Sequence, residues 1–280
     1  MANYYYLIAG LPDISFDDSK PAYTVDQFRD EVYQALSAAD RKVMDILVLE
    51  NECRSLISAL SAISGSDKQS QFCGMPLEDL IASAKAQEPC PAGIPRFVYA
   101  FIQEWVDDSW RPKAAFAEDR LWSLFYEYAM QCSNGLVRKW YEFNLDLNNI
   151  MTAITARKYD LDIQKVIVGS NDTANALRTS GARDWGLSQE LEFFDDVARL
   201  TEEDDISQRE RKADLIRWRW LEDNTFFNYF SIEKLFSYMV RLSMVQRWSS
   251  LDKEQGQQLF RQLIGDLKEQ TEVPAEFKTN

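Results

Sequence analysis

Histidine is absent from the 280-residue sequence, and its absence excludes several kinds of active site. Without an imidazole, the chain cannot assemble a Ser-His-Asp or Cys-His relay, and no histidine is available to hold zinc or haem. The cysteines do not fill this gap, because they are scattered singly and form no C-x-x-C pair: Cys53, Cys73, Cys90 and Cys132. Such thiols are typical of a reducing compartment. We therefore expect a protein that is not an enzyme and that binds no metal and no cofactor.

Glycine and proline are also scarce, with 10 and 8 residues respectively. These numbers are too small for a β protein with many turns, and they favour long helices joined at a few breaks. The strongest break is Glu88–Pro95, which contains three of the prolines. The sequence predicts an all-α, funnel-like bundle of long helices in a single domain over residues 1–280, with a sub-domain joint at 88–95.

Long apolar runs are missing as well. No stretch approaches the roughly 18 apolar residues that span a bilayer, and Met1–Gly10 lacks the basic start of a signal peptide, so we expect no direct membrane span. The net charge is −14, from 45 acidic and 31 basic residues, which argues against nucleic acid and against an anionic membrane face. Partners should be basic or neutral proteins.

Helical spacing of apolar residues is the main positive signal. Thr24 and Gln27 fit a capping box that begins the first secure helix, whereas residues 4–9 fit either a short strand or a helical turn. The later helices are predicted at 37–64, 76–85, 95–106, 113–132, 134–159, 171–180, 188–200, 202–223, 231–249 and 252–269.

Paired carboxylates are the most tempting chemical motif, because helical Mg²⁺-dependent isoprenoid synthases bind a diphosphate through aspartate-rich helices. The candidates Asp107–Asp108 and Asp195–Asp196 carry Arg111 and Arg199 near the position of the third carboxylate. Asn171–Asp172 lacks the glutamate that should follow it. No G-x-x-x-x-G-K-[ST] phosphate loop occurs either. This kind of enzyme is therefore the least favoured alternative.

Basic residues near position 215 are a second candidate for a binding site. Lys212, Arg217 and Arg219 could contact an anion, but Trp218 and Trp220 alternate with them. We therefore expect the basic side chains to stack on these rings and to extend over the core, and not to bind an anion.

Three polar residues lie along one edge of an apolar helical stripe: Asp146, Asn149 and Arg157. Polar groups at a core margin usually bond to neighbouring helices, so a structural role is favoured for them.

The segment Leu145–Arg157 resembles the D-x-x-N-(six or seven residues)-R helix of the C/d subunit of V-type and A-type ATPases. Near the C-terminus, Glu233 followed by Arg241 resembles a late helix of that family. The opening Tyr4–Asp13 resembles a bacterial family of uncharacterised proteins encoded among V-type ATPase subunits.

This resemblance implies a non-catalytic collar subunit of a V-type ATPase or ATP synthase. Such a collar links the central axle to the membrane rotor ring, transmits torque during proton or sodium transport, and lies in the cytoplasm at the inner membrane through protein partners. Its motif residues would be structural: Asp146, Asn149, Arg157, Glu233 and Arg241. The alternative is a free-standing helical scaffold, which a shared exposed face of Trp105, Trp110 and Trp185 would favour.

Overall fold

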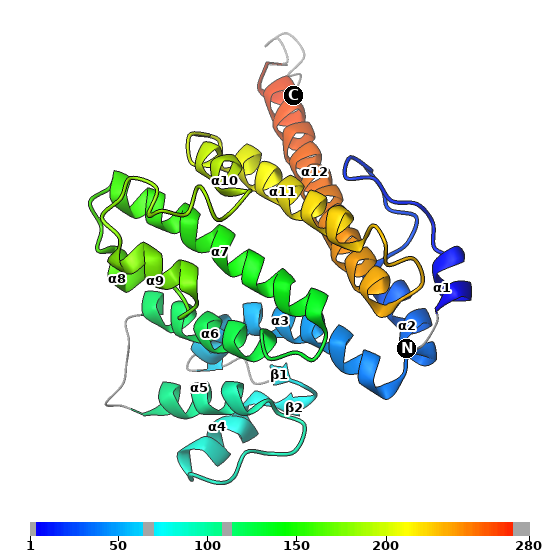
Figure 1. The fold of residues 1–280 in the computed structure, drawn as a ribbon. Coiled ribbons are helices and arrows are strands. Elements are labelled where there is room, and N and C mark those ends of the chain that lie inside the picture. The colour runs from blue at the N-terminus through cyan, green and yellow to red at the C-terminus, as the bar shows by residue number, and fades with distance from the viewer. Residues whose placement is uncertain (1–3, 64–69, 108–113, 271–280) are drawn as a thin grey trace, which may run out of the picture.

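The chain folds into helices that pack around a central long helix (Figure 1). The computed structural model describes residues 4–63, 70–107 and 114–270. These ranges contain twelve α-helices and one hairpin of two-residue strands. The all-α fold class predicted from the scarcity of glycine and proline is confirmed.

The first half of the chain contains five helices and the hairpin. Thr24 caps the second helix through the predicted capping box, in which Thr24 accepts from the Gln27 amide and Gln27 accepts from the Thr24 amide. Residues 5–9 are helical, which decides between the two alternatives for this segment. The elements are α1 (Tyr5–Ala9), α2 (Val25–Ala35), α3 (Ala38–Ile63), β1 (Gln71–Phe72), β2 (Met75–Pro76), α4 (Leu77–Lys85) and α5 (Arg96–Val106).

The second half contains α6 (Ala114–Ala129), α7 (Gly135–Lys158), α8 (Ile163–Val166), α9 (Asp172–Thr179), α10 (Phe194–Leu200), α11 (Ile206–Thr225) and α12 (Ile232–Gln270). Two predicted helix starts in this half are wrong. The helix predicted from 188 begins only at Phe194. The helix predicted from 202 begins at Ile206, where Asp205 accepts from the Gln208 amide as the N-cap.

The predicted break near residue 250 is also wrong, because α12 continues through it. At this point the hydroxyls of Ser249 and Ser250 donate back to the carbonyls of Val245 and Gln246, each at 2.8 Å. Bonding to the preceding turn leaves the helical backbone intact.

Helix α7 lies at the centre of the fold and contacts α6, α8, α9, α10 and α11, whereas α12 contacts α2, α3 and α11 (Figure 1). One hydrophobic cluster extends through these helices, with Phe125, Tyr141 and Phe236 among its largest fully buried side chains. Residues 86–95 connect α4 to α5, and these two helices pack against each other. The core therefore continues across the connection that contains the Pro-rich break.

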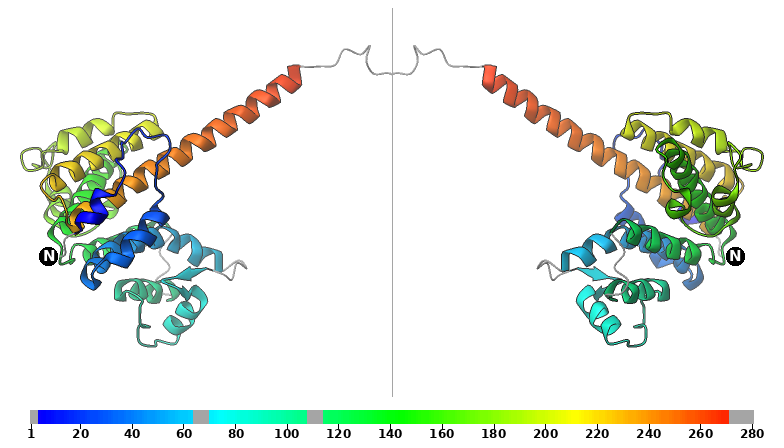
Figure 2. Two further views of the ribbon diagram at one scale, coloured as in Figure 1. Left: turned by 90° about the vertical axis from the view of Figure 1, so that its right-hand side faces the viewer. Right: turned by 90° about the vertical axis from the view of Figure 1, so that its left-hand side faces the viewer.

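Helix α12 is the longest element, with 39 residues. At 1.5 Å per residue it is roughly 58 Å long. Its first part packs in the body, and its C-terminal part projects well beyond the other helices (Figure 2). Among the described residues, no helix combines the length and hydropathy needed to cross a bilayer.

Candidate functional sites

Asp146 and Asn149, two of the predicted motif residues, bond to the chain that follows α7. Asn149 donates its side-chain N–H to the Val168 carbonyl at 2.7 Å and accepts the Val168 amide at 3.0 Å, so it pairs with both polar groups of that peptide. Asp146 accepts from the Asn171 side-chain amide at 2.8 Å. Both side chains are buried. They attach the segment before α9 to the central helix.

Arg157 holds a later part of the same segment. Its guanidinium donates to the carbonyls of Arg183 and Ala182 at 2.5 and 3.2 Å and lies 3.8 Å above the ring of Trp185. We call Asp146, Asn149 and Arg157 together the α7 brace, because each connects α7 to residues 167–185. The geometry of the brace is that of a stiffening element.

The carboxyl of Asp146 has unusual electrostatics. Burial raises its pKa to about 6, and the charges of Glu142 and Asp172 also raise it. Hydrogen bonds from Asn171 and Thr173 favour the charged form and oppose this shift. The folded protein therefore holds the proton of Asp146 more tightly than an unfolded chain does.

Glu233 and Arg241, the other predicted motif residues, have different partners. Glu233 accepts from the side-chain amide of Asn134, the N-cap of α7, at 2.7 Å. Arg241 is buried, donates to Glu222 at 3.3 Å and lies 5.0 Å above the ring of Trp218. Each residue thus connects α12 to a neighbouring helix.

Two of the candidates considered for magnesium make ordinary structural contacts. Asp196 forms an exposed ion pair with Arg199 at 3.5 Å, and Asn171 caps α9 by accepting from the Ala174 amide. Asp108 and Arg111 lie outside the described residues. Within residues 4–63, 70–107 and 114–270, no three acidic or cysteine side chains are grouped as a metal ion would need.

The exposed tryptophan face that would favour a free-standing scaffold is not formed by the residues considered for it. Trp185 is buried beneath Arg157, and Trp105 is half-buried beside Phe101. Trp110 lies outside the described residues.

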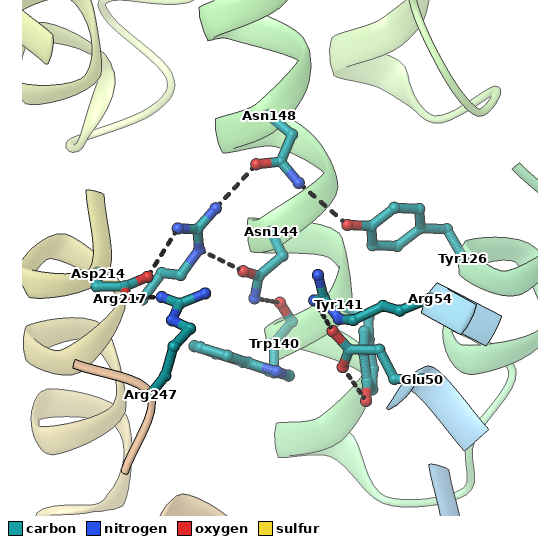
Figure 3. A network of polar contacts seen from close by, with 10 residues as sticks. All are labelled: Glu50, Arg54, Tyr126, Trp140, Tyr141, Asn144, Asn148, Asp214, Arg217 and Arg247. Atoms are coloured by element: carbon teal, nitrogen blue, oxygen red, sulfur yellow. Dashed lines mark hydrogen bonds and ion pairs between the residues drawn. The ribbon is translucent and has the colours of Figure 1, made fainter. Parts of the chain in front are cut away.

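The sequence did not predict a polar cavity of about 510 Å³ that lies between α3, α7, α11 and α12. Three arginines line it, each from a different helix: Arg54 of α3, Arg217 of α11 and Arg247 of α12. Figure 3 shows Arg54 and Arg247 extending toward the centre of this network from opposite sides. Aromatic side chains also line it, namely Tyr126, Trp140 and Tyr141, together with apolar side chains such as Leu47 and Met244.

Arg217 connects two of these helices. Its Nε donates to Asn144 at 2.9 Å and its Nη2 donates to Asn148 at 2.8 Å, both on α7 (Figure 3). Asn148 in turn donates to the hydroxyl of Tyr126 at 3.2 Å. The prediction that Arg217 extends over the core is therefore wrong. Its guanidinium enters a buried polar network, whereas nearby Lys212 pairs with Glu203 at the surface at 2.5 Å.

Asp214 is the buried anion of this network. One oxygen accepts from Arg217 at 3.1 Å, and the other accepts from Arg247 and from the indole N–H of Trp248, the latter at 2.9 Å. Only 2% of the residue is exposed. Across the cavity, Glu50 accepts from Arg54 at 2.5 Å and from the Tyr141 hydroxyl at 3.1 Å. Every oxygen of these two carboxylates therefore has a donor.

A different part of the surface carries exposed aromatic side chains on α1 and on the turn between α11 and α12. The ring centroids of Tyr5 and Phe230 are 4.6 Å apart, and the Tyr4 amide donates to the Phe230 carbonyl at 3.0 Å. We call this set the aromatic surface: Tyr5, Tyr6, Phe226, Phe227, Tyr229 and Phe230. Exposed apolar patches of this kind mark interaction sites.

The segments that form the aromatic surface are acidic. Residues 4–18 and 222–233 contain six aspartates or glutamates and no lysine or arginine. Two of these carboxylates pair with arginines from elsewhere, Asp17 with Arg211 at 2.9 Å and Glu222 with Arg241 at 3.3 Å. A partner with basic or neutral character suits this surface, whereas an anionic lipid face does not.

Fold and sites together define a helical protein with a braced central helix, a polar cavity and an aromatic surface. The chain belongs to the family described as "Protein of unknown function (DUF2764)", whose model matches residues 1–271. Comparison with curated proteins and comparison with solved structures each give no match.

Proposed function

We propose that this chain is a non-catalytic collar subunit of a V-type ATPase or ATP synthase. It would seat the soluble central axle on the membrane rotor ring and transmit torque during ATP-coupled proton or sodium transport. Its place would be cytoplasmic, at the inner membrane through these protein partners. The motif helix around Asp146 and the late Glu233–Arg241 helix supply the resemblance that suggests this function.

The observation that carries the proposal is the aromatic surface. Phe227 and Tyr6 are 81% and 89% exposed, and a protein that acts alone gains nothing from presenting such rings to water. Phenylalanine and tyrosine are enriched at protein interfaces, where they supply much of the buried apolar area. A subunit that works by holding two partners needs such surfaces and needs no reactive group.

The α7 brace supports the same function from inside the molecule. A part that transmits torque must resist bending, and the brace fixes residues 167–185 to the central helix through bonds made by Asp146, Asn149 and Arg157. The network around Asp214 similarly connects α11 to α12. Buried hydrogen-bonded networks rigidify the elements they join.

The proposal predicts that the tagged full-length chain captures V-type ATPase stalk and ring subunits from solubilised native membranes. The double variant Phe227→Ser with Tyr6→Ser should reduce this capture by about tenfold or more, because aromatic anchors supply a large share of interface energy. Its stability should change little, since both side chains are already exposed. Mass spectrometry of the captured proteins measures the first effect, and thermal unfolding checks the second.

Tyr159→Ser is the matched control. Tyr159 is 64% exposed and lies at the C-terminal end of α7. The aromatic surface lies near the opposite end, because Glu233 beside it accepts from Asn134, the N-cap of α7. The 24 residues of α7 separate these ends by roughly 36 Å. Recovery of no ATPase subunit by the unmodified chain would overturn the proposal. Capture of an unrelated partner would favour a free-standing scaffold instead.

A further inference from the structure

We propose that the cavity between α3, α7, α11 and α12 binds a small phosphate-bearing anion through Arg54, Arg217 and Arg247. This inference goes beyond the collar function and does not depend on it. Three guanidinium groups from three separate helices line one cavity in a chain with a net charge of −14. The planar fork of arginine suits the tetrahedral oxygens of phosphate, which accept several N–H bonds at once.

Three carboxylates line the cavity beside the three arginines, and two of them already have a donor on each oxygen. Glu50 and Asp214 have a donor on each of their four oxygens. The arginines keep donors in reserve, since a guanidinium has five N–H groups. Arg217 uses three of them in the bonds given above, and Arg54 and Arg247 each use one.

The exposure of the arginines makes these donors accessible. The side chains of Arg54 and Arg247 are 58% and 49% exposed, and both extend toward the network from opposite sides (Figure 3). Glu210, the third carboxylate of the lining, is also exposed. An incoming anion can therefore reach two guanidinium groups without breaking the buried bonds of Asp214.

The charge of Arg54 also acts on the other two guanidinium groups. Burial is the main cause that lowers the pKa of Arg217 and of Arg247, and the charge of Arg54 lowers both further, whereas Glu50 and Glu210 raise them. The pKa of Arg54 itself is raised, since burial lowers it but Glu50 raises it. An anion in the cavity would stabilise the charged forms of Arg217 and Arg247.

The size of the cavity indicates more than a bare phosphate. A volume of about 510 Å³ falls within the roughly 300–1,000 Å³ typical of small-molecule sites. Tyr126, Trp140 and Tyr141 form an aromatic wall beside the arginines, although only 9%, 4% and 2% of these residues is exposed. An organic group attached to the phosphate, such as a nucleoside, can pack against such rings.

Inorganic pyrophosphate and ADP are the probes that test this site on the purified full-length chain. Both are titrated in EDTA, with sodium chloride at matched ionic strength as the reference, and binding is followed by calorimetry and by the thermal unfolding midpoint. We expect saturable binding of at least one probe and a higher midpoint than in the chloride reference. Tighter binding of ADP than of pyrophosphate would indicate that the organic group contacts the aromatic wall.

The double variant Arg54→Gln with Arg247→Gln should weaken binding by about tenfold or more, since each removes charge-assisted bonds to the anion. Arg29→Gln with Arg199→Gln is the matched control, because it removes the same charge from exposed ion pairs elsewhere. Circular dichroism establishes that each variant is folded.

Three results would overturn the proposal: no change beyond the chloride reference, equal weakening in both double variants, or undiminished binding when Arg54 and Arg247 are replaced. Binding that requires added Mg²⁺ would also contradict it and would point to a metal–diphosphate site. The result of the ATPase capture experiment does not affect any of these outcomes. Each of the two proposals can therefore be overturned independently of the other.

Discussion

Replacing Asp214 with alanine is expected to lower the free energy of unfolding by about 3–5 kcal/mol, the cost typical of breaking a buried ion pair from one side. Asp214 is the shared acceptor for Arg217, Arg247 and the indole of Trp248. Its removal leaves the buried guanidinium of Arg217 without a counter-charge. Urea denaturation followed by circular dichroism measures the loss.

Asp196→Ala is the control for Asp214→Ala. Asp196 also pairs with an arginine three residues away on its helix, but its side chain is 57% exposed, against 3% for Asp214. Exposed pairs of this kind contribute about 0–1 kcal/mol. If both substitutions cost the same, burial of the Asp214 network would not be a source of stability.

The helices were predictable because each depends on local spacing. Thr24 and Gln27 lie three residues apart, and the capping box they form needs no knowledge of the rest of the fold. Helix ends were less predictable than helix existence. A break was predicted between residues 249 and 252, yet α12 continues through it, and the hydroxyls of Ser249 and Ser250 bond within this helix.

The α7 brace was partly accessible from sequence for a similar reason. Asp146, Asn149 and Arg157 share one edge of a single helix, so their alignment follows from helical geometry alone. The partners of these three residues do not follow from helical geometry. Val168, Asn171 and the carbonyl of Arg183 meet the helix only because the chain turns back along it.

The arginine cavity could not be found in this way. Glu50, Tyr126, Asn148 and Arg217 belong to four different helices, and no local spacing links them. The only local signal was the cluster of basic residues around Arg217. The tryptophans that alternate with these basic residues favour extension over the core, so this signal alone does not reveal the cavity.

Protonation of Asp146 is expected to make stability depend on pH between about 4 and 6. The pKa of this carboxyl is raised to about 6 in the folded protein, mainly by burial, against 3.8 as its ordinary value. The folded state therefore binds the proton more tightly than the unfolded chain. The stabilisation is fully present below pH 4 and is lost as the pH rises through 6. The expected change is on the order of 3 kcal/mol.

Asparagine at this position isolates the effect. Asp146→Asn keeps an oxygen that can accept from Asn171 but cannot ionise, so its stability relative to the unmodified chain should increase by about 2 kcal/mol between pH 4 and pH 7. Urea denaturation of both proteins across this range measures the difference, and the titration of all other carboxylates cancels in the comparison. A difference that stays constant with pH would show that the folded-state pKa of Asp146 is not raised.

Alanine at the same position separates bonding from charge. Asp146→Ala removes the acceptor for Asn171 and Thr173 and leaves polar groups of the brace without partners, so it should destabilise the fold by about 1–3 kcal/mol even at pH 4. Because Asp146 is 5% exposed, its loss should alter stability more than capture of stalk subunits. Reduced capture with an unchanged melting temperature would instead place Asp146 in a partner contact. The alanine and asparagine variants together therefore distinguish a brace that stiffens α7 from a residue that binds the axle.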